Sequence, residues 1–267
     1  MDTGRWVEVD DRVWVRRCAE LDQSLGLVVG EERCLVVDTG TDDVHGAAWA
    51  EAVRHLTTLP WSVVVTHAHW DHFFGTSAFQ PCAVWAHPRC RRAVETSAEE
   101  QRAEWVECYR EQGKEVAADR LAAATLVLPN HDVPHQVELD LGGRHVELCH
   151  LGRGHTDNDI VVHVPDAKVV FAGDLVEQGA PPSIGPDSVL PEWPSTLDAV
   201  IEMRTRLVVP GHGDPVANAF VARQRDELKQ LADLVAAVHA GELSMEDALH
   251  RSPYPEEYTR PAFPSSV

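Results

Sequence analysis

The chain has 267 residues, which is enough for one or two domains that bury a core without help from disulfides. Hydrophobic residues make up 44% of the chain and charged residues 25%, so disordered and fibrous classes are excluded. Acidic residues outnumber basic residues by 43 to 23, and the net charge of −20 argues against nucleic acid or a membrane surface as a partner. Because the sequence shows neither a secretory signal nor an apolar run of about 18 residues, we expect a cytoplasmic protein.

Short runs rich in Val and Leu alternate with helical patterns along the chain. The first half predicts strands at 6–9, 13–17, 25–29, 34–37, 61–66 and 82–86, with a helix from Asp42 or Asp43 to Leu56. Helical patterns follow at 88–113 and 114–124. The second half predicts strands at 136–139, 144–150, 160–164, 169–172 and 207–209, and helices at 195–204, 216–240 and 244–249. This order fits either two sheets covered by helices on the outside or a single mixed sheet.

Three histidines and an aspartate lie within six residues directly after the predicted strand at 61–66. They form the pattern His67-Ala-His69-Trp-Asp71-His72. Neutral imidazole and carboxylate ligands suit zinc and also iron or manganese. The pattern contains no cysteine thiolate that would favour one of these metals. His67 and His69 can share one metal ion from an extended segment. Asp71 and His72 begin the next turn and can face a second ion.

Three further ligand candidates follow predicted strands in the second half of the chain. His155 lies in Gly-Arg-Gly-His-Thr-Asp, Asp174 in Phe-Ala-Gly-Asp and His212 in Val-Pro-Gly-His-Gly-Asp. Each is a metal-ligand type that we place on a glycine-flanked loop at the end of an apolar strand. One such residue is a weak signal, but the ordered set is a strong one.

Together with Asp38 in Val-Val-Asp-Thr-Gly, these motifs make the chain resemble the metallo-β-lactamase superfamily from about residue 20 to residue 215. The resemblance implies an α/β fold, a four-layer αβ/βα sandwich with metal ions at the rim between its two sheets. It also implies a supporting role for Asp38, which would orient the metal loop through hydrogen bonds. An alternative for Asp38 is a purely local role in the turn before Gly40.

The resemblance further implies which residues hold which metal ion. The first ion would be held by His67, His69 and His155, and the second by Asp71, His72 and His212. Asp174 would bridge the two ions.

Two dications about 3.5–4 Å apart can share a water molecule and lower its pKa towards neutrality. We therefore predict a dinuclear metal-dependent hydrolase with two zinc ions, manganese and iron being the alternatives. A metal-bridging hydroxide would attack the carbonyl of a small ester, thioester, lactone or amide. Asp71 would be the catalytic residue, because it can accept a hydrogen bond from this nucleophile and orient it.

The ligand types discriminate among members of the superfamily. Asp174 stands where one subclass of secreted β-lactamases has Cys, and His69 stands where flavodiiron proteins have Glu. The acidic tail at 226–267 lacks the substrate-reading pattern of glyoxalase II, and the negative charge disfavours the tRNA-processing members. A mononuclear iron enzyme similar to persulfide dioxygenases and a β-lactamase remain as alternatives.

Six residues outside the ligand set are candidates for the substrate pocket. They are three aromatic residues near the histidine cluster or on the helix after it, and three residues in or beside the loop at 179–191: Trp70, Trp105, Tyr109, Glu177, Ile184 and Trp193. For the aromatic residues, packing on the core is an equal or stronger alternative.

We predict a catalytic domain at 1–215, with a helical insertion at about 88–125, and a C-terminal helical extension at 216–267 packed on the same domain. The Leu and Val spacing in the extension suits packing on the domain or on a second subunit, so a homodimer stays open. The expected partner is a small-molecule substrate. His239, which has no neighbouring ligand set, is predicted to be a surface residue.

Overall fold

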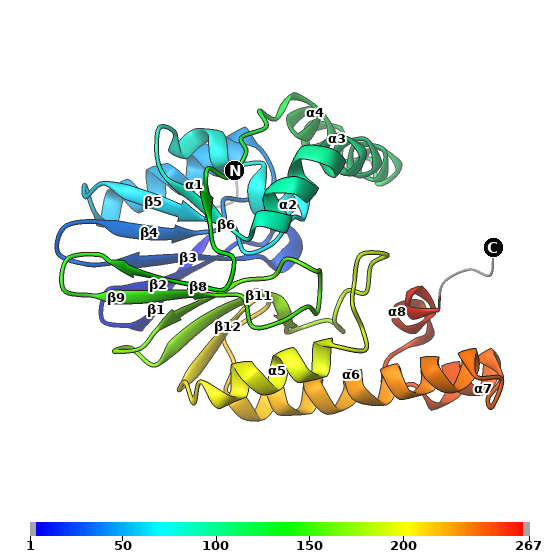
Figure 1. Ribbon diagram of the computed structural model, residues 1–267. Coiled ribbons are helices and arrows are strands. Elements are labelled where there is room, and N and C mark those ends of the chain that lie inside the picture. The colour runs from blue at the N-terminus through cyan, green and yellow to red at the C-terminus, as the bar shows by residue number, and fades with distance from the viewer. Residues whose placement is uncertain (1–3, 264–267) are drawn as a thin grey trace.

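The computed structural model describes residues 4–263, and in them two sheets pack face to face with helices on both outer faces (Figure 1). This arrangement confirms the predicted four-layer αβ/βα sandwich and excludes the single mixed sheet. The predicted catalytic domain at 1–215 includes residues 1–3, and the predicted extension at 216–267 includes residues 264–267. These terminal residues lie outside the described part of the chain.

The first sheet is built from the N-terminal half of the chain. Its spatial order follows the sequence: β1 (Arg5–Asp10), β2 (Val13–Arg17), β3 (Ser24–Val29), β4 (Cys34–Val37), β5 (Trp61–Val64), β6 (Val84–Ala86) and β7 (His131–Asp132). Strands β1 to β4 pair antiparallel, and β4 to β7 pair parallel. The carboxyl ends of the parallel strands therefore meet at one edge, which is where the loop after β5 begins.

The second sheet contains the remaining strands. Its order is β12 (Leu207–His212), β11 (Val169–Glu177), β10 (Val161–Val164), β9 (His145–Cys149) and β8 (Gln136–Asp140). Only β11 and β12 pair parallel. Their carboxyl ends therefore point to the same side of the molecule.

The helices cover the two outer faces. Those on the first sheet are α1 (Asp43–Leu56), α3 (Pro88–Glu111) and α4 (Glu115–Ala123), with the short α2 (Trp70–Phe73) at the sheet edge (Figure 1). Those on the second sheet are α5 (Trp193–Glu202) and α6 (Asn218–His239), followed by α7 (Met245–Arg251) and α8 (Glu256–Thr259). Three 3-10 turns complete the set, at Glu20–Asp22, Thr76–Phe79 and Arg260–Ala262.

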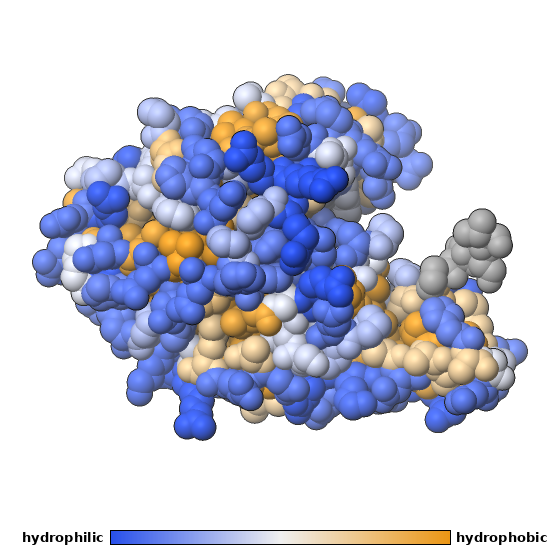
Figure 2. Space-filling view, in the orientation of Figure 1, coloured by the Kyte–Doolittle hydropathy of each residue, from blue (hydrophilic) through white to orange (hydrophobic). Residues whose placement is uncertain are grey.

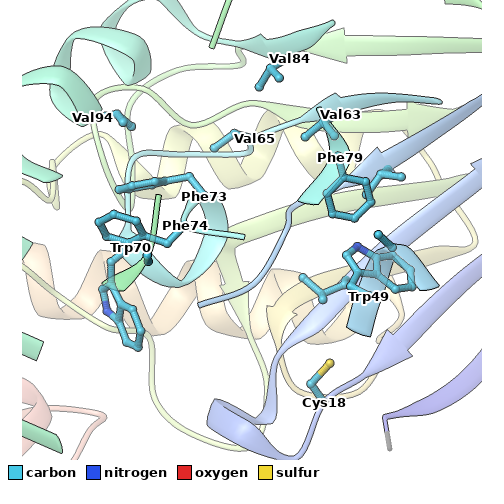
Figure 3. Packing of buried hydrophobic residues seen from close by; sticks show 14 of the residues in the cluster. Cys18, Trp49, Val63, Val65, Trp70, Phe73, Phe74, Phe79, Val84 and Val94 are labelled. Atoms are coloured by element: carbon cyan, nitrogen blue, oxygen red, sulfur yellow. The ribbon is translucent and has the colours of Figure 1, made fainter. Parts of the chain in front are cut away.

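Three apolar layers hold the sandwich together. The middle layer lies between the sheets, where alternating residues such as Val13 and Val15 of β2 face Val162 and Val164 of β10. A second layer packs α1, α3 and α4 on the first sheet, and Figure 3 shows part of it, with Trp49 of α1 among the strands. The third layer packs α5 and α6 on the second sheet through residues such as Leu228. Burial of these apolar side chains is the main stabilising contribution.

Strand β11 differs from its prediction, because it continues to Glu177 instead of ending at Ala172. Gly173 has a left-handed backbone with φ +54°, and the register against β12 shifts there. A Cβ at this position would lie 2.9 Å from the side chain of Thr66, so only glycine fits without displacement. Asp174 therefore lies inside a strand, not on a loop as the sequence indicated. His212 is likewise the last residue of β12.

The helices of the predicted extension pack on the body of the protein. Leu228 and Leu231 of α6 share the third apolar layer with Trp193 of α5. Among the described helices, none combines the length and the apolar character needed to span a bilayer.

Candidate metal centre

Asp38 anchors the loop that follows β5. Its backbone, at the end of β4, is left-handed with φ +58°, a conformation that Asp and Asn tolerate better than most residues. Its carboxylate accepts hydrogen bonds from the backbone N–H and the hydroxyl of Thr66 and from Nδ1 of His72, each at 2.8 Å. The start of the histidine cluster and its last member are therefore held by a single buried side chain.

The structure brings four of the predicted ligands together as a first group. Suitable atoms of His67, His69, His155 and Asp174 all lie within 4.8 Å of one another. Nδ1 of His69 is 2.8 Å from Nε2 of His155, and Asp174 Oδ2 is 3.6 Å from Nε2 of His155. His67 and His69 come from the loop after β5. His155 comes from the loop that precedes β10, and Asp174 comes from the second sheet.

The other three predicted ligands form a second group beside the first. Suitable atoms of Asp71, His72 and His212 lie within 4.8 Å of one another, and Nε2 of His212 is 3.2 Å from Oδ2 of Asp71. Asp174 also faces this group, because its Oδ1 is 3.3 Å from Nε2 of His72 and its Oδ2 is 3.4 Å from Nε2 of His212. Asp174 thus lies between the two groups.

Every imidazole of the two groups has one nitrogen held by the protein and the other directed at the centre. Nδ1 is held in four of them, by the Thr66 hydroxyl for His67, Asp38 for His72, the Ser183 carbonyl for His155 and the Leu21 carbonyl for His212. In His69 the outer nitrogen is Nε2, which lies 3.0 Å from Asp187. This is the arrangement by which proteins fix the tautomer and orientation of metal-binding histidines.

Three buried atoms at the centre lack a hydrogen-bond partner among the described residues: Nε2 of His67, Nε2 of His72 and Oδ1 of Asp174. Leaving such atoms unpaired is costly in a folded protein. Imidazole nitrogen and carboxylate oxygen are ligands of zinc, iron and manganese, so the residues present fit a metal cofactor that would satisfy these atoms.

The pKa values of the histidines in the first group are shifted in different directions by their surroundings. Burial lowers the pKa of His67 well below its usual value, and burial together with His69 lowers the pKa of His155 to about 4. For His69, burial acts in the same direction, but the hydrogen bond and charge of Asp187 outweigh it and the pKa is raised. Neutral imidazole, the form that binds metal, is therefore favoured at His67 and His155.

The second group carries paired charges. Burial acts to lower the pKa of His72 and His212, but the nearby carboxylates of Asp71 and Asp174 outweigh it and raise both values well above the usual one. For Asp174, burial acts to raise the pKa, but His212 and His72 hold it well below the usual range. A divalent cation would replace the positive charge of the protonated histidines, so its binding would release protons.

Several supporting residues were not identified from the sequence. Asn158 accepts a hydrogen bond from the backbone N–H of Ala68 at 3.0 Å, and Gln23 donates one to the carbonyl of Asp71 at 2.6 Å. Asp187 contacts His69 from the loop after β11. None of the three belongs to a motif with a fixed spacing, although Asn158 follows His155 within the same loop.

The predicted pocket residues divide by exposure. Trp105 and Ile184 keep part of their surface exposed. The other four are buried: Trp70, Tyr109, Glu177 and Trp193. Trp70 lies under Trp105, with ring centroids 4.9 Å apart. Burial raises the pKa of Glu177 to about 8, and Glu177 accepts a hydrogen bond from the backbone N–H of Ser183.

The molecular surface is hollowed on the side where α2 lies. Figure 2 shows this hollow between the region of α3 and α4 and the region of α6 to α8, with mostly hydrophilic residues around it. In the first group, His69 is the partly exposed histidine, with 24% of its side chain exposed, and it directly precedes α2.

Comparison with known proteins places the chain in a family. A profile of the metallo-β-lactamase superfamily matches residues 19–212. The chain is 26% identical to the metallo-β-lactamase type 2 of Bacillus cereus over 83% of this chain and 81% of that one. It is 28% identical to the acyl-coenzyme A thioesterase MBLAC2 of Homo sapiens over 71% and 72%. A solved metallo-β-lactamase from Pontibacter korlensis, 19% identical, superposes with a TM-score of 0.65 over 85% of this chain and 99% of that one. The chain belongs to the metallo-β-lactamase superfamily.

Proposed function

We propose that this metal-dependent hydrolase is dinuclear and attacks the carbonyl carbon of a small ester, thioester, lactone or amide, so that the bond from this carbon to oxygen, sulfur or nitrogen is cleaved. The observation that carries the proposal is the pair of adjacent ligand groups that share Asp174. A mononuclear site needs only one such group. Here two groups converge, and each contains buried ligand atoms without a hydrogen-bond partner among the described residues.

We propose ligand roles that this geometry supports. The first ion would be held by His67, His69 and His155, the second by Asp71, His72 and His212, and Asp174 would contact both. Two bound divalent ions, zinc in the first instance, would lower the pKa of a water molecule and polarise a carbonyl group. No protein nucleophile is required.

The protein's own residues would position the reactants. Asp71 is a buried member of the second group, and its carboxylate would accept a hydrogen bond from the attacking water and so orient it. Asp38 would keep His72 in place through the hydrogen bond to Nδ1. The hollow beside α2 would admit the substrate, with the exposed part of Trp105 as one apolar contact.

The relatives suggest two substrate classes for the first assays. The Bacillus cereus relative is named as a β-lactamase and the Homo sapiens relative as an acyl-coenzyme A thioesterase. Both names describe cleavage of an acyl bond, to nitrogen in one case and to sulfur in the other. We therefore propose acyl compounds as the substrate class, with thioesters and lactams compared directly.

The test combines metal analysis with a substrate panel. Protein expressed with zinc, iron and manganese all available is analysed by plasma mass spectrometry and assayed on thioesters, lactones, esters and β-lactams. We expect about two zinc or manganese ions per chain and hydrolysis of at least one class, with Asp174→Asn as the inactive control. One iron per chain together with oxygen uptake on persulfides would overturn the proposal, because both point to the mononuclear dioxygenase.

A further inference from the structure

Helix α3 lies directly against the metal loop, and the side chain of Gln101 makes the closest contact. The Gln101 amide accepts a hydrogen bond from the backbone N–H of Trp70 at 2.9 Å and donates one to the carbonyl of Ala68, also at 2.9 Å. These two groups belong to the peptide bonds on either side of His69. Gln101 therefore holds both peptide planes that set the backbone position of this one residue.

The orientation of the amide is fixed by its partners. Trp70 offers only a donor and Ala68 only an acceptor, so the oxygen of Gln101 must face Trp70 and its nitrogen must face Ala68. The second hydrogen of the nitrogen is donated to the hydroxyl of Ser97, one turn earlier in α3, at 3.0 Å. All of these bonds are made by a side chain that is only partly exposed, where a hydrogen bond is worth more than in water.

The same face of α3 continues the contact along α2. Trp105 and Tyr109 follow Gln101 at intervals of four residues, so the three side chains lie on one side of the helix. Both rings pack on the ring of Trp70, with centroid distances of 4.9 Å and 5.8 Å. In Figure 3, Trp70 lies with Phe73 and Phe74 on the side of the cluster towards Val94 of α3.

The far end of this face contacts the turn that orients His212 of the second ligand group. The hydroxyl of Tyr109 donates to the carboxylate of Glu20 at 3.2 Å. Glu20 begins the 3-10 turn Glu20–Asp22, in which the carbonyl of Leu21 accepts the hydrogen bond from Nδ1 of His212. One face of α3 thus contacts the backbone that carries His69 and the turn that orients His212.

We propose that Gln101 is a positioning residue of the metal centre, and that α3 serves to hold the metal loop through the face formed by Ser97, Gln101, Trp105 and Tyr109. His69 needs this support more than the other first-group histidines, because it is the partly exposed one. The inference rests on the proposed metal-binding role of His69. It assigns a function to the helical insertion that the ligand motif alone does not.

The test measures Zn²⁺ affinity by competition with a chromophoric chelator in metal-free full-length protein. Gln101→Met keeps the length of the side chain but removes both hydrogen bonds to the loop. We expect one of the two bound equivalents to weaken by about 10- to 100-fold, the usual effect of losing an outer-shell partner. Gln101→Glu keeps the acceptor for Trp70 but places a second oxygen against the carbonyl of Ala68, so it should weaken that equivalent as well. The visible absorption of the Co²⁺-loaded protein should change with the affinity.

Two control variants separate positioning from simple stability. Gln112→Met makes the same change at the other end of α3, where the side chain donates a hydrogen bond to Sγ of Cys108, and should leave Zn²⁺ affinity unchanged. Val94→Ala loosens the packing of α3 on the core without touching the loop hydrogen bonds. The thermal midpoint of each metal-free variant is measured beside its affinity.

The outcomes are distinct. The inference is supported when Gln101→Met binds Zn²⁺ more weakly than Val94→Ala does, while the metal-free thermal midpoint of Val94→Ala is equal to or lower than that of Gln101→Met. Equal affinity in Gln101→Met and the unaltered protein, or an equal loss in Val94→Ala, overturns it. Absence of Zn²⁺ binding in the unaltered protein would instead refute the proposed function.

Discussion

Gly211 lies against the carboxylate that joins the two ligand groups. A Cβ at this position would sit 1.8 Å from Oδ1 of Asp174, although the backbone of Gly211 is not left-handed and any residue could adopt it. A side chain here is therefore excluded by the position of Asp174 and not by backbone strain. This makes Gly211 a way to displace Asp174, the proposed bridging residue, without changing any proposed ligand.

We predict that Gly211→Ala lowers the metal content or weakens metal binding by at least about tenfold, because the added methyl group forces Asp174 away from one group. Plasma mass spectrometry after dialysis against a fixed free zinc concentration measures the effect. His239→Ala, on the predicted surface of α6, is the control and should keep the full metal content. Full metal content in Gly211→Ala would contradict a bridging position for Asp174.

Asp38 offers a test of two roles that the sequence left open. If Asp38 acted only in the turn before Gly40, Asn would replace it without loss, since Asn tolerates the same backbone conformation. The carboxylate, however, accepts from three donors, and an amide can face only part of them.

We therefore predict that Asp38→Asn weakens zinc binding about 10- to 100-fold and lowers the free energy of unfolding by about 1–3 kcal/mol. Zinc titration and urea unfolding of the metal-free protein measure the two effects. A variant that matches the unaltered protein in both would show that Asp38 has only the local role.

At the level of single residues, the candidate ligands and the supporting Asp38 could be predicted from the sequence, and the other supports could not. His155 and His212 lie in short motifs whose residue types are those that bind metal. Their outer nitrogens, however, are held by the carbonyls of Ser183 and Leu21, and a backbone carbonyl leaves no signal in the choice of side chain. Such partners depend on how the chain folds back, so only the structure identifies them.

The same contrast applies to whole elements. Strands β2 and β4 were predicted with the bounds that the structure has, because their apolar residues alternate or run without interruption. Strand β11 is longer than the strand predicted at 169–172, because a glycine such as Gly173 within a strand pattern also indicates an interruption. The structure passes through this glycine in a left-handed bulge, so the strand carries Asp174 into the centre.

Helix α3 begins at a histidine that caps it. Nδ1 of His87 accepts a hydrogen bond from the backbone N–H of Arg89 at 3.1 Å, which requires the neutral ring. Burial and the stacked ring of His150 lower the pKa of His87 to about 4. The unfolded chain binds this proton near pH 6.5, so it holds more protons than the folded protein between about pH 6.5 and 4. Stability must fall as the pH drops through this window.

We predict that His87→Asn reduces this acid sensitivity, because Asn makes the same cap and does not titrate. The shift of His87 corresponds to about 3 kcal/mol, which sets the upper limit of the difference between the two proteins at pH 4. Urea unfolding of both metal-free proteins at intervals from pH 7 to pH 4 measures it. Parallel curves over the whole range would rule out His87 as the titrating group.

At the scale of the whole molecule, the metal centre joins the two sheets. Asp71 and His72 follow β5 of the first sheet, whereas Asp174 and His212 lie in β11 and β12 of the second. Bound metal would therefore cross-link the two halves of the sandwich, and in its absence the buried side chains of Asp71, His72 and Asp174 lie together with the partly buried His212. Metal binding and global stability should consequently be coupled.

We predict that removing the metal with a chelator lowers the thermal midpoint of the entire protein in one transition. At a free zinc concentration about 1,000 times the dissociation constant, bound metal contributes about 4 kcal/mol, which corresponds to a shift on the order of 10 °C for a chain of this size. Circular dichroism melting with and without chelator at pH 7.5 measures the shift. It should shrink as the pH falls below 7.5, because the raised pKa values of His72 and His212 let protons compete with the metal for these two side chains, and it should be smaller in Asp174→Asn at every pH. Equal midpoints with and without chelator would mean that the centre does not couple the two sheets.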